Sequence, residues 1–510
     1  MNPLALDNLQ SLSWFFPEFA LTAGVLLVVL WDLATKGSNR IRGVAAITVA
    51  ALLTSGGLSM VYLVRALDGQ VQTFTLFQGL LAFDPFAHLM RVVFAFAAGI
   101  AVIFAIPATE TGAHDPKRRG SGEFFTLLLV VTLGLNLMAM SRNLLMIYLS
   151  LELVSVISFV LAGFKLGDRR SAEGALKYVI YGGTASGVML YGMSWLFGIS
   201  QSLDLGEIGN QVALATAQNG RVPLVLLVGV VCIIAGFGYK ISAAPFHMWT
   251  PDVYEGSPTS ITAFLSVGPK AAGFAVLLRF FDEGVHATTH LNGQLTPWAL
   301  LAGLLAMASM IVGNFTALGQ NNVKRMLAYS SIAHAGYMLL GFGVFDVVGK
   351  QAILFYIVTY ALMNLGAFLV VAAVAERHGD NEDITHFNGL GGRSPVLAAT
   401  MAIFLFSLTG LPPFAGFVGK FYIFAALIQA GGDWNWFLAA VGVVNSVVSL
   451  FYYARVIRAM YLTPASSPEP FSTRESWTTT TIALAVPTLV LGVYWGPIYD
   501  FITASLALPR

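Results

Sequence analysis

Four lysines and one glutamate stand inside apolar stretches of this 510-residue sequence. They are Glu152 in YLSLELVSVISF, Lys177 in GALKYVIYGG, Lys240 in GFGYKISAAPFH, Lys270 in LSVGPKAAGF and Lys420 in LPPFAGFVGKFY. A lysine at the centre of a bilayer costs about 3 kcal/mol on insertion scales, so its presence requires a reason. Burial lowers the pKa of a lysine in general and a nearby carboxylate raises it, so such a set can exchange protons near neutral pH. The residue types therefore indicate a proton store inside a membrane.

A second interpretation makes these charges interhelical hydrogen-bonding groups that never release a proton. Single polar contacts in membranes contribute only modestly, so five such residues in one chain favour the proton store. Lys177 fits either interpretation, because it lies early in its helix, where its stem can reach the membrane surface. His334 in YSSIAHAGYM is a further relay candidate, since the unperturbed pKa of histidine is near physiological pH and three hydroxyl side chains lie close in sequence. A packed core histidine is the alternative there.

Composition sets the environment of these residues. Hydrophobic residues make up 57% of the chain and charged residues 10%, against about 25% charged in a soluble domain. Apolar stretches of about 20 residues each span a bilayer as a helix. The sequence predicts fourteen, with centres near Val25, Leu52, Ala97, Val130, Ser155, Ala185, Val230, Ala271, Leu304, Met338, Thr359, Phe417, Val444 and Leu489. The expected fold class is an all-α polytopic membrane protein.

The basic residues are distributed unevenly between the predicted loops. Alternate loops carry sixteen on one side, namely Lys36, Arg40, Arg42, Lys117, Arg118, Arg119, Lys165, Arg169, Arg170, Lys324, Arg325, Arg377, Arg393, Arg455, Arg458 and Arg474. The other side has six: Arg65, Arg142, Arg221, Arg279, Lys350 and Arg510. Positive loops face the cytoplasm, so both termini are expected outside it. Arg91 falls within the third span, where we expect a fixed ion pair because arginine hardly loses its proton.

An internal repeat appears when the sequence is shifted by about 178 to 182 residues, which places Lys240 on Lys420 and LAGFKLGD on LLGFGVFD. Five helices separate the two lysines, and this odd number inverts the second copy relative to the first. Inverted repeats with interrupted helices are typical of transporters. Pro245, Pro412 and Pro413 mark two such interruptions. We therefore divide the single transmembrane domain into helices 1–3 (1–122), a first five-helix repeat (123–282), an inverted second repeat (297–463) and helix 14 (477–505).

Several functions are disfavoured by what the sequence lacks. Cys232 is its only cysteine, so a disulfide framework or an iron–sulfur ligand set is not expected. No nucleotide-binding glycine loop follows a strand, because no strand is evident, and no histidine spacing resembles a closed metal site. We expect no electron carrier and no bound cofactor in this chain. The first residues lack a basic region before the first span, so that span is expected to be retained.

The segments YKISAAPFHMWTPDVYEGSPT, NNVKRMLAYSSIAHAGY and LPPFAGFVGKFY closely resemble the antiporter-like membrane subunits of respiratory complex I. The similarity covers nearly the whole chain and is strongest to the subunit N type. Subunit L has a long additional lateral helix, and subunit M typically has glutamate where Lys420 stands. The resemblance implies two inverted five-helix repeats with discontinuous helices 7 and 12. It also implies proton transfer through Glu152, Lys240, Lys270 and Lys420, with a less uniform role for Lys177.

The resemblance further implies the surroundings of the chain. NADH, FMN, iron–sulfur clusters and quinone are then held by other subunits, and the partners are neighbouring antiporter-like and small hydrophobic subunits and the lipid bilayer, with no nucleic acid. The location is the bacterial inner membrane. Quinone reduction elsewhere is expected to shift the Glu152 and Lys240 charges and push a proton through Lys270 to Lys420. A stand-alone cation/proton antiporter, a membrane-bound hydrogenase subunit and an inert scaffold are the alternatives.

Overall fold

The computed structural model describes residues 4–36, 38–112, 121–291, 293–465, 471 and 473–506. Its α-helices are α1 (Asn8–Leu12), α2 (Phe16–Ala34), α3 (Ser38–Leu67), α4 (Pro85–Gly112), α5 (Ser121–Met140), α6 (Leu144–Ala162), α7 (Arg169–Ser200), α8 (Leu205–Asn219), α9 (Leu224–Lys240), α10 (Thr250–Gly256), α11 (Thr259–Arg279), α12 (Pro297–Leu318), α13 (Val323–Phe342), α14 (Val347–Arg377), α15 (Leu390–Arg393), α16 (Pro395–Thr409), α17 (Ala415–Ala430), α18 (Asp433–Leu462), α19 (Glu475–Val493) and α20 (Gly496–Ser505). A π-helical turn η2 (Phe280–Gly284) extends α11, and a 3-10 turn η3 (Ile384–Phe387) precedes α15.

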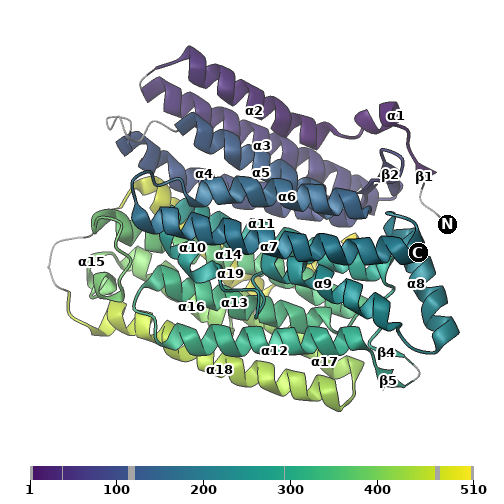
Figure 1. Ribbon diagram of the computed structural model, residues 1–510. Coiled ribbons are helices and arrows are strands. Elements are labelled where there is room, and N and C mark those ends of the chain that lie inside the picture. Colours follow the sequence, from purple (N-terminus) through teal and green to yellow (C-terminus); the bar gives the residue numbers. More distant parts are fainter. Residues whose placement is uncertain are drawn as a thin grey trace.

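The long helices lie side by side, as expected for a chain whose backbone must satisfy its own hydrogen bonds in lipid (Figure 1). Within the described residues, ten are long and apolar enough to cross a membrane. Three further apolar helices, α9, α16 and α17, are shorter. The prediction of a mostly helical membrane protein is confirmed.

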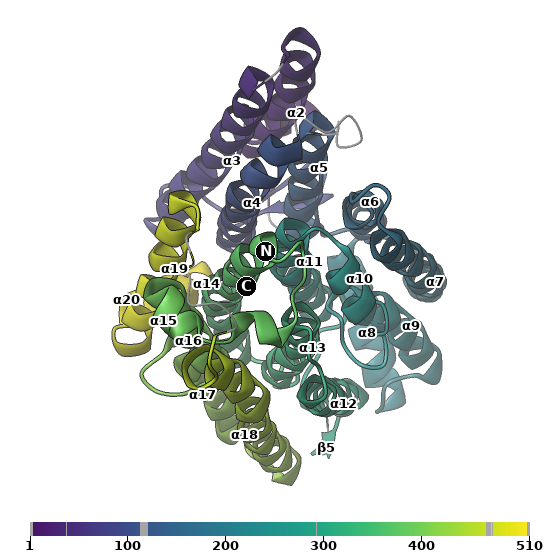
Figure 2. The same cartoon turned by 90° about the vertical axis from the view of Figure 1, so that its left-hand side faces the viewer.

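Three helices occupy the middle of the bundle. Viewed along the helices, α11, α13 and α14 are central, α6 to α10 lie on one side and α16, α17 and α19 on another, while α2 and α3 are outermost (Figure 2). The most apolar window of α11 is buried over its whole length and that of α14 over 83%. Polar side chains on these central helices are therefore shielded from lipid by the surrounding helices.

Two helical segments are interrupted at the predicted prolines. α9 ends at Lys240, and α10 begins only at Thr250. α16 ends at Thr409, and α17 begins at Ala415. The two lysines differ in their position relative to the break, because Lys240 closes the helix before one break whereas Lys420 lies in the helix after the other. Each break leaves carbonyl groups without helical partners next to a lysine.

Short strands occur in the connections, contrary to the expectation that the chain has none. β1 (Leu4–Ala5), β2 (Phe74–Leu76) and β3 (Leu81–Phe83) form one small sheet, with β1 parallel and β3 antiparallel to β2. β4 (His290–Leu291) and β5 (Gln294–Leu295) form a hairpin. Strands of two or three residues are too short to show an alternating hydrophobic pattern, so periodicity could not detect them. The helix predicted over 477–505 is likewise divided into α19 and α20.

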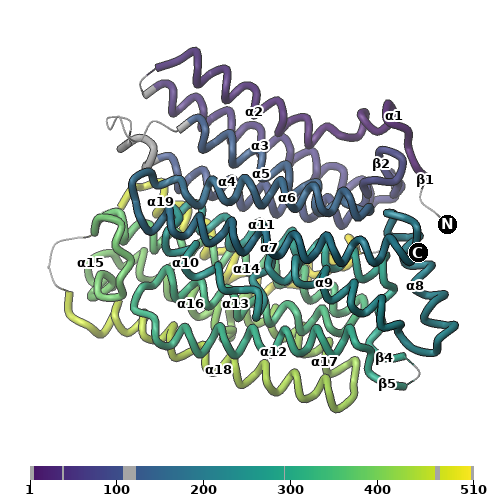
Figure 3. The backbone as a smooth tube through the Cα atoms, in the orientation of Figure 1, coloured from purple at the N-terminus to yellow at the C-terminus, as the bar shows by residue number. Residues whose placement is uncertain are grey.

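Two isolated β-bridges repeat with a constant offset. Asn143 pairs with Asp204 just before α6, and Asn322 pairs with Asp383 just before α13, so both members are shifted by 179 residues (322 − 143 and 383 − 204). Asp204 caps α8 and Asp383 caps η3 near α15. Figures 1 and 3 place α8 and α15 at opposite ends of the bundle, which we call the α8 end and the α15 end. The two matching β-bridges therefore lie at opposite ends of the bundle.

Candidate functional site

Lys240 lies at the first helix break and is buried. Its Nζ donates a hydrogen bond to Ser155 Oγ of α6 at 3.1 Å. The stem of Lys240 packs against Gly273 of α11, where an added Cβ would lie 3.5 Å from Lys240 Cγ and 2.6 Å from Ile241 Cγ2. Only a glycine at this position lets α11 approach the break so closely. The break thus faces the fully buried helix that carries Lys270.

Glu152 lies on α6, three residues before Ser155. Its Oε1 is buried and has no hydrogen-bond partner in the described part of the chain. A direct contact with Lys240 is not among the ion pairs of the described residues, and the lysine bonds the Ser155 hydroxyl instead. Glu152 and Lys240 therefore interact through space, and Ser155, which binds Lys240, lies one turn from Glu152 on α6.

Lys270 stands one turn before Gly273 on α11 and is buried. Its Nζ donates to both the carbonyl oxygen and Oγ of Ser331 on α13, each at 2.5 Å. Residues three apart on a helix share a face, so Lys270 lies on the same side of α11 as Gly273, against which the stem of Lys240 packs. From there Lys270 reaches across to α13.

His334 lies on α13, three residues after Ser331, and is buried. Its Nδ1 is 2.6 Å from the Tyr356 hydroxyl of α14, and its Nε2 is 3.3 Å from the Tyr453 hydroxyl of α18. The Tyr453 hydroxyl also lies 2.5 Å from Ser330 Oγ. The histidine is therefore held between hydroxyl groups from two helices, α14 and α18.

Lys420 occupies the second break. Its Nζ donates to the Leu408 and Thr409 carbonyl oxygens at 3.1 and 2.8 Å and to Ser446 Oγ at 3.0 Å. These carbonyls are at the C-terminal end of α16, which carries partial negative charge. Gly410 follows with φ +88°, and a Cβ there would come within 2.8 Å of Lys420 Cδ. The ammonium thus replaces the hydrogen bonds that the break removes.

One face of α13 connects these groups. Ser331, His334 and Tyr337 follow at intervals of three residues, and the Lys420 Nζ lies over the Tyr337 ring, 4.3 Å from its centroid. Lys270 and Lys420 are thus brought against the buried face of α13 that carries His334. Sequence reasoning singled out the lysines and His334 but missed Ser155, Tyr356 and Tyr453. The three-residue spacing of Ser331, His334 and Tyr337 was the signal in the sequence for a shared polar face of α13.

Lys177 does not belong to this buried line. Its side chain is 37% exposed and pairs with Glu173 at 2.8 Å and with Asp252 at 2.5 Å. Arg325 binds Asp252 and Glu255 at 2.7 Å each. These residues form an ionic cluster at the α15 end that ties α7, α10 and α13 together. Between a role in the proton store and a stem that reaches the membrane surface, the geometry of Lys177 favours the second.

The ionic cluster gives a pH-dependent contribution to stability. Burial alone raises the pKa of Asp252, but hydrogen bonds from Lys177 and Arg325 hold that pKa below its ordinary value of 3.8. A carboxyl with a depressed pKa stabilises the fold above its unfolded-state pKa, and this contribution is lost as the pH falls through the folded-state pKa. We expect Asp252→Asn to lower the melting temperature of the purified protein complex at pH 7. Melting curves should show the difference from wild type shrink progressively as the pH falls below about 4, towards the folded-state pKa; a difference that is independent of pH would contradict this origin.

Arg91 forms the fixed ion pair that the sequence predicts. Its Nη2 lies 2.9 Å from Glu18 Oε1 of α2, and neither side chain is exposed. Asn136 of α5 also donates to Glu18 Oε1, at 3.2 Å, and Arg91 Nη1 lies 2.9 Å from His88 Nδ1. Glu18 was missed, although an acidic residue in the first apolar run was visible in the sequence.

Two basic residues that the sequence predicts to lie in loops form further buried ionic contacts. Arg279 is the last residue of α11 and pairs with Asp84 and Glu283, each at 2.9 Å, at the α8 end. Lys324 begins α13 and lies 3.3 Å from Glu382, and its Nζ also donates to the Ser257 carbonyl oxygen at 2.7 Å. Charge counting places a residue on one side of the membrane, but it cannot tell whether the residue is covered by neighbouring segments.

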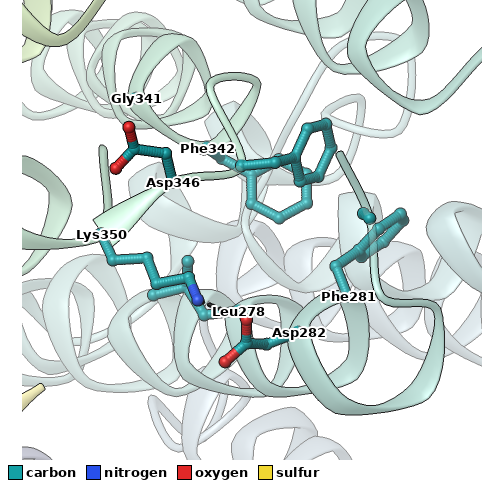
Figure 4. A pocket seen from close by; sticks show the side chains of 9 residues that line it. Leu278, Phe281, Asp282, Gly341, Phe342, Asp346 and Lys350 are labelled. Atoms are coloured by element: carbon teal, nitrogen blue, oxygen red, sulfur yellow. Dashed lines mark hydrogen bonds and ion pairs between the residues drawn. The ribbon is translucent and has the colours of Figure 1, made fainter. Parts of the chain in front are cut away.

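A small cavity lies near the end of α11, away from the lysine line. Its walls include Leu278, Phe281, Asp282, Phe342 and Lys350, and Lys350 bonds the Asp282 carboxylate at its edge (Figure 4). Its volume is about 10 Å³, which is room for about one water molecule. A larger hollow of about 500 Å³ near the α8 end is lined mainly by leucine and phenylalanine side chains of α1 and the β2–β3 connection. Neither cavity contains the buried lysines.

Broken helices that present buried lysines to a polar helix face define an antiporter-like membrane subunit, and comparisons with known proteins agree. A sequence profile described as NADH:quinone oxidoreductase/Mrp antiporter, transmembrane region, matches residues 141–449. A Sorangium cellulosum protein named NADH-quinone oxidoreductase subunit N 2 is 60% identical over 510 residues, with both chains fully covered. Subunit N of an Anaeromyxobacter species is 46% identical and covers 100% of this chain and 99% of its own.

Solved structures give the same picture. A chain of respiratory complex I from Thermus thermophilus is 30% identical, with a TM-score of 0.76 and coverage of 96% of this chain and 99% of that chain. A chain of the Mrp complex from a Dietzia species has a TM-score of 0.82 at 21% identity, covering 98% and 97%, which shows a shared fold. The chain belongs to the subunit N family of NADH-quinone oxidoreductases.

Proposed function

We propose that this chain translocates protons as a membrane subunit of an NADH-quinone oxidoreductase, coupled to electron transfer in other subunits. The observation that carries the proposal is the buried series Lys240, Lys270, His334 and Lys420, each hydrogen-bonded to at least one side-chain hydroxyl group. Each member can hold a proton, and none is fixed by a carboxylate among the described ion pairs. NADH, FMN, iron–sulfur clusters and quinone belong to the other subunits in this proposal.

The proposed architecture has fourteen transmembrane segments in two inverted repeats. Ten helices qualify by length and composition, and α7, α9 with α10, α13, and α16 with α17 supply four more. The 179-residue offset between the Asn143–Asp204 and Asn322–Asp383 bridges supports the repeat. Their location at opposite ends supports the inversion. The proposed units are 1–122, 123–282, 297–463 and 477–505.

The orientation in the bacterial inner membrane follows from charge. The α15 end carries Arg377, Arg393 and Arg325, and positively charged connections face the cytoplasm. The α8 end then faces outward, together with both termini. The partners are the adjoining antiporter-like and small hydrophobic subunits of the complex.

The proposed mechanism uses changes in local charge. A change of charge near Glu152 alters the affinity of Lys240 for its proton, since the two interact at low dielectric without a direct bond. The released proton passes to Lys270 and along the α13 face to Lys420, from which it leaves. The Glu152 Oε1 atom, which is buried and has no hydrogen-bond partner among the described residues, suits a group whose surroundings change during turnover.

The Mrp-like fold keeps a stand-alone cation/proton antiporter as a second candidate. Such a protein would use the same lysines but would have no redox partners. Purification in mild detergent distinguishes the two, because a respiratory subunit copurifies with flavin and iron–sulfur polypeptides. A membrane-bound hydrogenase subunit is a third candidate, which its electron donor would distinguish.

Lys420→Met in the reconstituted complex tests the proposed function. We expect at least a threefold fall in protons pumped per electron, because the methionine cannot hold a proton; Ser446 and the two carbonyls can still bind water there and sustain a remainder. Lys350→Met is the matched control, since Lys350 pairs with Asp282 outside the buried series. Full pumping by an assembled Lys420→Met complex would refute the proposed role.

A further inference from the structure

The histidines of the described chain differ in the groups that surround their ring nitrogens. His88 Nδ1 contacts Arg91 Nη1, and a guanidinium only donates, so this nitrogen must accept. His378 Nδ1 contacts the Val374 carbonyl oxygen at 2.8 Å, which only accepts, so this nitrogen must carry the proton. In both cases the partner fixes the tautomer.

His334 has hydroxyl partners on both sides. Tyr356 lies at Nδ1 and Tyr453 at Nε2, and a hydroxyl both donates and accepts. Either tautomer therefore satisfies both contacts once the hydroxyl hydrogens rotate. The two tautomers of His334 are close in energy with respect to these partners, unlike those of His88 and His378.

The hydroxyls also connect His334 to the neighbouring lysines. Tyr453 lies 2.5 Å from Ser330 Oγ, and the next residue, Ser331, binds Lys270. On the other side, the Tyr356 ring packs beside Gly419, where an added Cβ would overlap it, and Lys420 follows directly. The Nε2 side is thus connected to the part of α13 that binds Lys270, and the Nδ1 side to the part of α17 that carries Lys420.

We propose that Tyr453 and Tyr356 are proton-transfer residues that let His334 take a proton at Nε2 and release one at Nδ1. Tyr453 gives its hydroxyl proton to Nε2 and takes another from Ser330, which is resupplied by water on the Lys270 side. The Nδ1 proton passes to the Tyr356 oxygen, and Tyr356 releases its own hydroxyl proton to water on the Lys420 side. The ring regains its first tautomer when a proton passes from Nε2 to Nδ1 through water, in the direction of transport. This inference rests on the proposed function.

Tyr453→Phe and Tyr452→Phe form a matched pair for the test. Tyr452 is the preceding residue, is equally buried, and donates its hydroxyl to Asn314 Oδ1 at 3.0 Å, so each change removes one buried hydroxyl from α18. In the reconstituted complex we expect Tyr453→Phe to lower protons pumped per electron at least threefold. Tyr452→Phe is expected to pump as wild type. Equal pumping by the two variants would overturn the inference, since a merely structural hydroxyl affects both alike.

Lys420→Met, measured in parallel, separates this inference from the proposed function. Loss of pumping in Lys420→Met with normal pumping in Tyr453→Phe refutes only the tyrosine relay. Normal pumping in both refutes the translocation function itself. Tyr356→Phe repeats the test at the other ring nitrogen, is expected to behave as Tyr453→Phe, and replaces that variant if it does not assemble. Normal pumping by Tyr356→Phe also overturns the inference.

Discussion

Lys240→Ala is expected to reduce proton pumping at least tenfold while the complex still assembles and transfers electrons to quinone. Lys240 is the titratable group at the first helix break, and its described partner is only the Ser155 hydroxyl. Alanine leaves nothing there that can store a proton, so the path from the Glu152 side ends before Lys270. Pumping is measured in proteoliposomes against the electron-transfer rate of the same preparation.

Glu152→Gln provides the comparison. Because Glu152 makes no direct bond to Lys240 among the described residues, we expect its neutralisation to weaken pumping less than Lys240→Ala does, through a lost long-range field. Assembly is checked by the subunit content of the purified complex. Unchanged pumping by an assembled Lys240→Ala complex favours the scaffold interpretation and contradicts the role given to this lysine.

Glu18→Leu is expected to destabilise the packing of α2 against α4 and α5 by about 3 to 5 kcal/mol, since it leaves a buried arginine without its counter-charge. Arg91 and Glu18 are both fully covered and 2.9 Å apart. The loss appears as a lower yield of assembled complex and a lower melting temperature.

The double variant Glu18→Leu with Arg91→Met supplies the control for this prediction. Replacing a whole buried ion pair by apolar side chains is often neutral, so we expect the second change to recover most of the stability. A double-mutant cycle measures this coupling. If the two losses simply add, the pair does not act as the ionic link between α2 and α4.

The sequence alone sufficed for the membrane class, both helix breaks and the buried lysines. Long apolar runs have one stable backbone conformation in lipid, and proline interrupts a helix through local sterics. Each of these properties depends on neighbouring residues only. The Arg91 ion pair was also foreseeable, because a permanently charged side chain in an apolar run must find a counter-charge.

The partners of those residues depended on tertiary structure. Periodicity does not state which face of α13 meets α14 and α18, so Tyr356 and Tyr453 could not be paired with His334 beforehand. It likewise could not show that Lys240 bonds Ser155 and that Lys177 joins a surface cluster. Sequence by itself determined that Lys240, Lys270 and Lys420 are placed within membrane-spanning segments, since that follows from the apolar residues around each of them. Only the packed bundle decided which of them share hydrogen bonds, because such contacts join residues far apart in the sequence, as for Arg279 and Asp84, which are 195 positions apart, and depend on helix rotation and approach.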